Sequence, residues 1–216
     1  MEDNYFTGNL PGELVHLKRL RLLNLTSNNF MGPIPFWLGS MSKLELLILS
    51  FNSFTGSLPP LLFSNLTNLK ALAMRNNSIQ GPIPKEIGNL KKLMFLDLQY
   101  NQISGSIPNT IYNLSLLELL GLSKNNLSEN IPYDLCHFSP RLYGIFLSDN
   151  QFVGHIPTSL HECSHLQTLS VAFNKLTGSI ANYIGNLTFL RTLELHENKF
   201  SGITLLCPII VHFSRF

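Results

Sequence analysis

Asparagine recurs along this chain at intervals of 24 or 25 residues, and each one opens a phrase close to N-x-(L/F/I)-x-G-x-(I/L)-P. Upstream of every one except the first lies the pattern L-x-x-(L/I)-x-(L/M/V). A repeat of this length that keeps its register over almost the whole chain predicts a solenoid, in which each unit forms one coil and packs on its neighbours. The recurring residues are Asn4, Asn28, Asn52, Asn77, Asn101, Asn125, Asn150, Asn174 and Asn198.

The apolar residues of each repeat predict a short strand. In the segment LELLILS, Leu47 and Leu49 alternate with other residues, so both side chains are expected to point inward from the strand. Parallel stacking at about 4.8 Å per coil would turn about nine 24-residue coils into a rod roughly 40 Å long. We therefore expect an α/β solenoid, a right-handed superhelix with a concave parallel β-sheet.

The phrase after each strand predicts how the coil closes. Its asparagine is expected to turn inward and bond the backbone of its own coil and the next one, replacing partners lost where the chain bends. Glycine and proline, as in Gly81 and Pro84, favour a tight bend, and segments such as IGNLKKL favour short 3-10 or irregular turns on the convex side. The expected structural ladder is Asn28, Asn52, Asn77, Asn101, Asn125, Asn150, Asn174 and Asn198.

Charge is sparse in this sequence. Charged residues make up 13% of the chain and the net charge is +2, whereas ordinary globular domains carry about 25% charged residues. No Lys/Arg cluster or basic face stands out along the sequence, so a nucleic acid partner is not expected. Polarity is carried largely by amides, as a ladder of buried asparagines requires.

Six N-x-S/T sequons, none with proline at the middle position, indicate a chain that passes through the secretory pathway. Three fall on the expected convex turns and one on the flank beyond the strand, so the concave sheet from residue 93 to 198 should be free of sugar. The expected glycosylation sites are Asn24, Asn65, Asn76, Asn113, Asn126 and Asn186.

The sequence at the two ends of the chain predicts a fragment of a longer gene product. Residues 1–204 form the expected solenoid, which begins inside a repeat without a signal peptide or a capping module. Residues 205–216 form an apolar tail that is far shorter than the ~20 residues needed to span a bilayer. We expect a fragment without a membrane span, whose uncapped terminal coils fold poorly or aggregate.

The coil consensus LxxLxxLxLxxNxLxGxIPxxLxxL resembles the plant-specific leucine-rich repeat over about residues 1–203. Segments such as IYNLSLLELLGLSKNNLS and IGNLTFLRTLELHENKFSG are similar to ectodomains of plant receptor-like serine/threonine kinases that include microbe-pattern receptors. The resemblance implies a solenoid on the extracellular side of the plasma membrane that senses a peptide or protein and signals in innate immunity. It also implies pairing with a co-receptor kinase that has its own leucine-rich repeat ectodomain.

The same resemblance implies a kinase elsewhere in full-length relatives, but this chain lacks the kinase glycine-rich loop and the HRD and DFG motifs. No catalytic residue, metal or cofactor is therefore expected here. The rivals are a secreted leucine-rich repeat inhibitor and a kinase-less receptor-like protein built from the same coils. Sequence beyond Phe216 would separate them.

Aromatic and charged side chains gather at outward positions of the expected concave sheet between residues 94 and 149. Exposed aromatics mixed with a few charges are typical of peptide and protein contacts. The alternative is that serine and tyrosine before the ladder asparagine are ordinary repeat consensus; Phe95 and Phe146 are informative because the consensus requires neither. The candidate residues are Met94, Phe95, Asp97, Tyr100, Lys124, Tyr143, Phe146 and Asp149.

One segment of the chain matches a catalytic zinc-binding motif. His161-Glu162-Cys163-Ser164-His165 matches HExxH, which on an α-helix sets two imidazoles on one face for zinc and supplies glutamate as the base of a metallopeptidase. The context argues against it, because Cys163 aligns with the core residue Leu90 and a 3-10 turn does not bring residues four apart onto one face.

The three cysteines Cys136, Cys163 and Cys207 leave at least one unpaired. Cys136 and Cys163 lie at similar offsets in adjacent coils, so a bridge between them is possible. The frequent use of free cysteine as a small core residue instead favours buried thiols.

Overall fold

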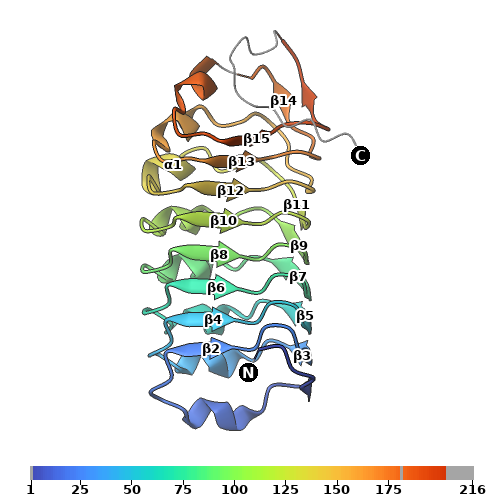
Figure 1. Cartoon of the computed structure of the whole chain (residues 1–216), viewed down its shortest axis with the longest axis vertical. Coiled ribbons are helices and arrows are strands. Elements are labelled where there is room, and N and C mark those ends of the chain that lie inside the picture. Colours follow the sequence, from blue (N-terminus) through green and yellow to red (C-terminus); the bar gives the residue numbers. More distant parts are fainter. Residues whose placement is uncertain (1, 181, 203–216) are drawn as a thin grey trace.

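The computed structural model describes residues 2–180 and 182–202, which form an elongated stack of coils. Figure 1 shows the strands of the larger sheet lying one above another, from β2 near the bottom to β15 near the top. Within the described residues this sheet has eight parallel strands, in the order β15-β13-β12-β10-β8-β6-β4-β2. The strands are β2 (Leu22–Asn24), β4 (Leu46–Ile48), β6 (Ala71–Ala73), β8 (Phe95–Asp97), β10 (Leu119–Gly121), β12 (Gly144–Phe146), β13 (Thr168–Ser170) and β15 (Thr192–Glu194).

Residues at the same position of successive repeats pair with one another across the sheet. Leu47 of β4 lies opposite Leu23 of β2 and Leu72 of β6, so equivalent residues stack across the sheet. Leu47 and Leu49 are completely buried, as their alternation predicted. The middle residue of each strand enters one continuous apolar core, whereas the first and third residues face outward. The predicted leucine-rich solenoid is confirmed.

A second parallel sheet lies along the flank, where the sequence analysis predicted only a bend (Figure 1). Its strands are formed by the residues that follow each ladder asparagine. In these strands Phe54 and Ile79 are buried and their neighbours are not, which is the alternation typical of a strand. The glycines of this segment have the positive φ that a bend requires, but the sequence analysis missed the sheet itself. In the described part of the chain this sheet comprises β1 (Thr7–Gly8), β3 (Asn29–Pro33), β5 (Ser53–Ser57), β7 (Ser78–Pro82), β9 (Gln102–Gly105) and β11 (Asn126–Leu127), and β14 (Thr177–Gly178) pairs separately with β16 (Lys199–Phe200).

The flank sheet stops where one repeat departs from its pattern. Gly81 and its equivalents in other coils have positive φ, +75° for Gly81, which suits glycine. Glu129 occupies the equivalent position in its coil and has a φ of +66°, a region that side chains disfavour. Among the described residues, β11 is followed along this flank by an isolated bridge between Asn130 and Val153 and then by the separate β14–β16 pair.

Short helical turns form the convex side, as predicted. Most begin after a proline with extended backbone, such as Pro84, and end with a hydrogen bond like that from the amide of Leu90 to the carbonyl of Ile87, 3.1 Å. One of them, α1, is α-helical. The described turns are η1 (Gly12–His16), η2 (Phe36–Ser40), η3 (Pro60–Phe63), η4 (Lys85–Asn89), η5 (Asn109–Asn113), α1 (Leu135–Phe138), η6 (Thr158–Glu162) and η7 (Asn182–Asn186).

The asparagines join each coil to the preceding one. The Asn125 side chain accepts a hydrogen bond from the amide of Ile103, 2.9 Å, through Oδ1. Its Nδ2 donates to the carbonyls of Leu98 and Leu122, both at 3.0 Å. The same bonds recur from Asn52 to Asn198. The sequence analysis expected bonds to the next coil, and this direction was wrong.

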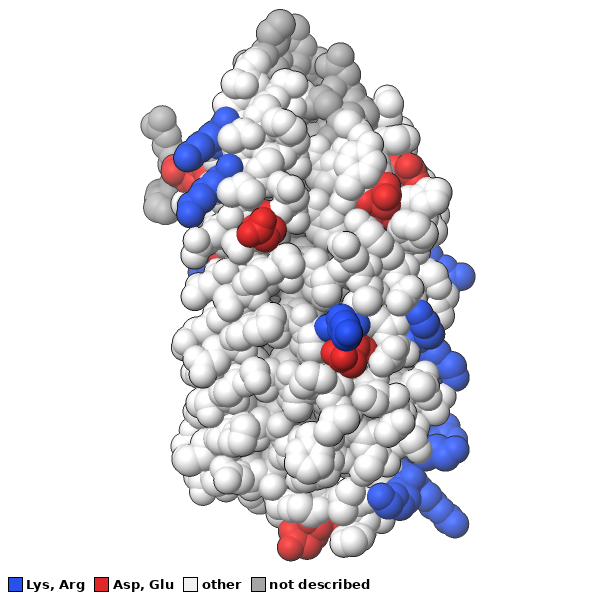
Figure 2. Space-filling view, turned by 180° about the vertical axis from the view of Figure 1, so that it is seen from behind, with Lys and Arg blue, Asp and Glu red and all other residues white. Residues whose placement is uncertain are grey.

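Charge is unevenly distributed around the solenoid. Figure 2, which views the molecule from behind, shows Lys and Arg side chains along the right-hand edge of the lower half. They come from the loops that lead from the convex turns into β2, β4, β6 and β8, where a single carboxylate, Glu45, accompanies them. The expectation that no basic cluster exists was wrong. We call these residues the basic rim: Lys18, Arg19, Arg21, Lys43, Lys70, Lys91 and Lys92.

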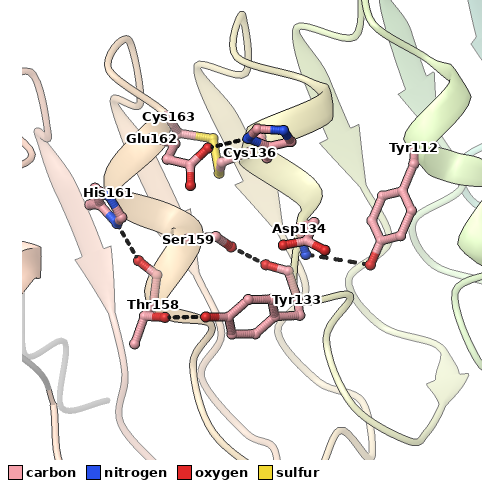
Figure 3. Close-up of polar contacts among 10 residues, drawn as sticks. Tyr112, Tyr133, Asp134, Cys136, Thr158, Ser159, His161, Glu162 and Cys163 are labelled. Atoms are coloured by element: carbon pink, nitrogen blue, oxygen red, sulfur yellow. Dashed lines mark hydrogen bonds and ion pairs between the residues drawn. A yellow bond between two sulfur atoms is a disulfide. The ribbon is translucent and has the colours of Figure 1, made fainter.

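A disulfide joins Cys136 of α1 to Cys163 at the end of η6 (Figure 3). Both residues are completely buried. Stacking of adjacent coils brings their Cα atoms to 4.9 Å although they are 27 residues apart, a separation that a disulfide accommodates. The preference for buried thiols was therefore wrong for this pair, and Cys207 lies outside the described residues.

The predicted tail of residues 205–216 also lies outside the described residues. Within residues 2–180 and 182–202, the helices are all too short to cross a bilayer.

We predict that Asn125→Ala lowers the free energy of unfolding by about 2–4 kcal/mol, because the amide of Ile103 and two carbonyls lose buried partners. Urea unfolding followed by circular dichroism measures this loss. The exposed neighbour Asn126 provides a matched control, since Asn126→Ala should change stability by no more than about 0.5 kcal/mol. Equal stability of the two variants would refute the structural role of the ladder.

We predict that replacing both Cys136 and Cys163 by serine destabilises the chain by about 3 kcal/mol, because the bridge restricts a loop of this length in the unfolded state. Cys207→Ser is introduced in both proteins so that only the described pair is compared. Reductant should lower the unfolding midpoint of the parent and leave the serine variant unchanged. Two free thiols per unfolded, unreduced parent chain would contradict the bridge.

Candidate ligand-binding surface

The strands of the larger sheet place the predicted site residues at defined positions across the concave face. Phe95 and Asp97 are the first and third residues of β8, and Phe146 is the third residue of β12. Tyr100 and Lys124 lie in the turns that follow β8 and β10. Asp149 follows β12 in the same way, whereas Met94 and Tyr143 precede β8 and β12 on the opposite edge.

Two glycines lie beneath neighbouring side chains in the middle of this face. Gly144 lies two residues before Phe146 and therefore shares its outward face. The Phe146 ring covers it: a Cβ on Gly144 would lie 2.8 Å from Phe146 Cε2. Gly121 on the adjacent strand is similarly flanked by the Gln99 and Asp97 side chains. The Phe146 ring thus lies along the sheet and keeps one part of its surface exposed.

Tyr100 lies between two cations from neighbouring coils. The guanidinium carbon of Arg75 is 4.6 Å from the centre of the Tyr100 ring, and Lys124 Nζ is 4.8 Å from it. Such contacts contribute about 0.5–1 kcal/mol each at exposed sites. Together they orient a ring that is 36% exposed. Arg75 was missing from the predicted site, although its place in the repeat, one coil before Tyr100, could have indicated it.

The residue before each ladder asparagine has a left-handed backbone. Tyr100, Lys124 and Asp149 have φ of +56°, +57° and +56°, values uncommon for residues other than glycine. The strain is offset by paired bonds to the following coil: the amide of Tyr100 donates to Ser123, and the amide of Asn101 donates to Lys124. This conformation therefore recurs in every coil and holds these side chains at a constant position on the concave edge.

The predicted residues do not form a single cluster. Among the eight, Tyr100 and Lys124 are in direct contact. Met94 is half-buried, and Tyr143 lines a hollow of about 450 Å³ with Glu118, Arg141, His165 and Gln167. The candidates instead span the width of the sheet, which fits a long ligand better than a small molecule.

The basic rim has its own hydrogen-bonded centre. Lys70 Nζ lies 2.7 Å and Arg21 Nη1 3.4 Å from the Glu45 carboxylate. The hydrogen bond and charge of Lys70 lower the pKa of Glu45, and Arg21 and Lys92 add to this effect. The lowered pKa favours the ionised carboxylate of Glu45, which contacts two of the cations. Lys92 Nζ donates to the Asn68 side chain, 2.8 Å.

The C-terminal part of the concave face combines paired hydroxyl and carboxylate groups with the exposed ring of Phe173. The hydroxyls of Ser148 and Ser170 are 2.5 Å apart, and Ser170 donates to Glu194, also at 2.5 Å. These bonds link three successive strands or turns across the face. Near β15 the outward groups thus include the Glu194 carboxylate, which these buried hydroxyls hold in place.

The sequon asparagines differ in exposure. Asn24 lies in β2, half-buried, and its amide bonds Glu2 and Thr26. Asn76 lies in the turn after β6. The other four lie away from the concave sheet, on the convex side or in β11. The exposed sequon asparagines are Asn65, Asn76, Asn113, Asn126 and Asn186.

The HExxH residues do not lie together on one α-helix. They begin in the 3-10 turn η6, and Cys163 is held in the disulfide. Glu162 pairs with His137, 2.8 Å, and the His161 ring bonds the carbonyl of Thr158, 2.6 Å (Figure 3). Across the described residues, no group of three or more His, Cys, Asp or Glu has the geometry to hold a metal ion.

Solved structures of plant receptor ectodomains are similar to this chain. The ectodomain of the membrane receptor kinase GASSHO1/SCHENGEN3 from Arabidopsis thaliana, in complex with CASPARIAN STRIP INTEGRITY FACTOR 2, is 36% identical with a TM-score of 0.86 over 90% of this chain and 23% of that one. The plant peptide hormone receptor RGFR1, in complex with RGF2, is 36% identical with a TM-score of 0.88 over 91% of this chain and 31% of that one.

The Arabidopsis receptor kinase HAESA, in complex with the peptide hormone IDA and the co-receptor SERK1, is 34% identical with a TM-score of 0.87, over 91% of this chain and 33% of that one. The chain thus spans a third or less of the length of these three structures. A comparison with curated protein sequences found no match. The family model described as a leucine-rich repeat region matches residues 3–200, and the chain belongs to the leucine-rich repeat family.

Proposed function

We propose that this chain is part of the ligand-sensing ectodomain of a plant receptor-like kinase, and that its concave face binds a peptide or a protein epitope. The observation that carries the proposal is the row of oriented, partly exposed aromatics Phe95, Tyr100 and Phe146, with Arg75 and Lys124 around the tyrosine. Aromatic side chains that are held in place lose little entropy on binding and are frequent at the centres of interfaces.

The solved neighbours support this proposal, because three of them are complexes of receptors with ligands of this kind. By the same analogy we place the chain on the extracellular side of the plasma membrane, as a glycoprotein, and propose a co-receptor with a leucine-rich repeat ectodomain as its second partner. Reception of a microbial pattern, and hence a role in innate immunity, is the narrower form of the proposal. Catalysis would belong to a kinase elsewhere in the full-length protein.

A secreted inhibitor or a kinase-less receptor would use the same coils. The full transcript separates these alternatives, because a membrane span followed by a kinase supports the receptor kinase, and a stop codon after a cysteine-rich cap supports the inhibitor.

We predict that Phe146→Ala weakens the binding of a peptide selected on this chain from a random display library by at least tenfold, about 1.4 kcal/mol. Tyr100→Ala should have a similar effect because it removes the ring that Arg75 and Lys124 flank. Fluorescence anisotropy with the labelled peptide measures both. Phe36→Ala, on the exposed convex turn η2, is the matched control. Unchanged affinity in both concave variants, or failure to select any peptide, would refute the proposed surface.

A sugar placed on the concave face provides an independent test. Asp97→Asn with Gln99→Thr creates a sequon on β8, and we expect its glycosylated form from a secretory host to lose peptide binding because a glycan would cover the sheet. Each single substitution lacks the sequon and serves as a control, as does the native convex sequon at Asn113. Mass spectrometry establishes occupancy. Full binding by a chain glycosylated at residue 97 would exclude the concave face.

A further inference from the structure

An apolar column runs along the N-terminal half of the concave face. The first residue of each strand faces outward, and strand register places these residues in one line from β2 to β10. Leu22 is 50% and Phe95 36% exposed, and the others are half-buried. From β12 onward the equivalent residues are Gly144, Thr168 and Thr192, so the apolar character ends. The apolar column consists of Leu22, Leu46, Ala71, Phe95 and Leu119.

The basic rim directly borders this column. Arg21 and Lys70 each precede a column residue, and the carbonyl of Arg21 accepts hydrogen bonds from the amides of both Glu45 and Leu46, 2.7 and 3.0 Å. The cations on the preceding loops, including Lys18, Lys43 and Lys91, are exposed. Within the described part of the chain, no side-chain hydrogen bond or ion pair occupies these three ammonium groups.

Charge distinguishes the two ends of the concave face. Along the column from β2 to β10, the loops that enter the strands carry the seven cations of the rim and two carboxylates: Glu45, which already contacts Arg21 and Lys70, and Glu118, which precedes Leu119. Toward β15 the face carries Glu194 and Glu197, and the loops into β12 and β15 contribute one cation each, Arg141 and Arg191. A ligand that lies along the N-terminal half therefore meets a positive potential on one side and apolar side chains beneath it.

We propose that the surface formed by the apolar column and the basic rim binds an acidic peptide segment that also carries large apolar side chains. The segment lies extended along the solenoid, with apolar side chains on the column and carboxylates toward the rim. Four strand intervals of about 4.8 Å make the column roughly 19 Å long, which an extended segment of about six residues covers. This inference rests on the proposed function and specifies the chemistry of one segment of its ligand: this segment covers the column, and the rest of the peptide continues over Tyr100 and Phe146.

Both halves of the surface are needed for this assignment. Exposed ion pairs contribute little individually and weaken with salt, so the rim supplies orientation and rate of association more than affinity. Burial of Leu22, Leu46 and Phe95 supplies the apolar contribution. A polyanion without apolar groups would leave the column exposed to water, and a basic peptide would be repelled by the rim.

The test begins with random 12-residue peptides displayed on phage and selected on the immobilised chain. We expect the enriched sequences to be net negative and to contain at least two of Leu, Ile, Phe, Trp or Met. The affinity of one enriched peptide, synthesised with a fluorophore, should fall at least tenfold for the chain with Lys18→Glu, Lys43→Glu and Lys91→Glu. The triple substitution Lys85→Glu, Lys175→Glu and Lys199→Glu makes the same change of charge away from the rim and should bind as the parent does.

The apolar half is tested with Leu46→Ser and Phe95→Ser together, which should also weaken binding at least tenfold; circular dichroism establishes that each variant folds. Net-positive peptides, or a rim variant that binds as well as the parent, would overturn this inference and leave the proposed function standing. Competition by poly-glutamate as strong as that by the peptide, with no effect of the serine variant, would show a general polyanion surface and overturn it too. Selection of no peptide would overturn both proposals.

Discussion

The hydrogen bonds of the ladder asparagines determine how closely one coil can follow another. Each amide reaches an N–H and a carbonyl of the preceding coil as well as carbonyls of its own coil, at the point where the strand ends and backbone groups lose their ladder partners. An apolar residue at Asn125 would leave these buried groups unpaired, and an exposed polar residue could not reach them. Because the amide bonds act across the coil boundary, they fix the register of both sheets together, and this register aligns equivalent outward residues along the concave face.

The residue type can vary at outward positions of the strands, whereas inward positions require an apolar residue that fills the core. Leu96 must fill the core, but its neighbours Phe95 and Asp97 carry no such requirement. Their variation between coils therefore produces a surface whose chemistry changes along the solenoid. Even the strained backbone at Tyr100 follows from the repeat, since two consecutive amides there bond the next coil. The scaffold determines position, and the residue types at these positions determine what a ligand meets.

Sequence analysis predicted those features that depend on neighbours within one repeat. The alternation at Leu47 and Leu49 gave the strand, and the spacing around Pro84 gave the convex turn. Contacts between coils were harder to predict, because they join residues more than twenty positions apart. Cys136 and Cys163 were read as thiols since nothing in the sequence measures their 4.9 Å Cα separation. The basic rim was missed for the same reason: Lys43 and Lys70 are isolated in the sequence, and only alignment by repeat phase brings them to one edge with Lys91 and Lys92.

Glu45 reduces the repulsion within the basic rim and leaves other cations of the rim able to bind a ligand. A row of cations at one edge repels itself, and this single carboxylate, ionised more readily because Lys70 bonds to it, offsets the repulsion between Arg21 and Lys70. Its contribution to stability is present above the ordinary pKa of glutamate and is lost as pH falls through its lowered value. Lys18, Lys43 and Lys91 remain outside this network. Among the described residues the rim therefore retains cations without a carboxylate partner, and the apolar column beside it favours a ligand with apolar side chains among its carboxylates.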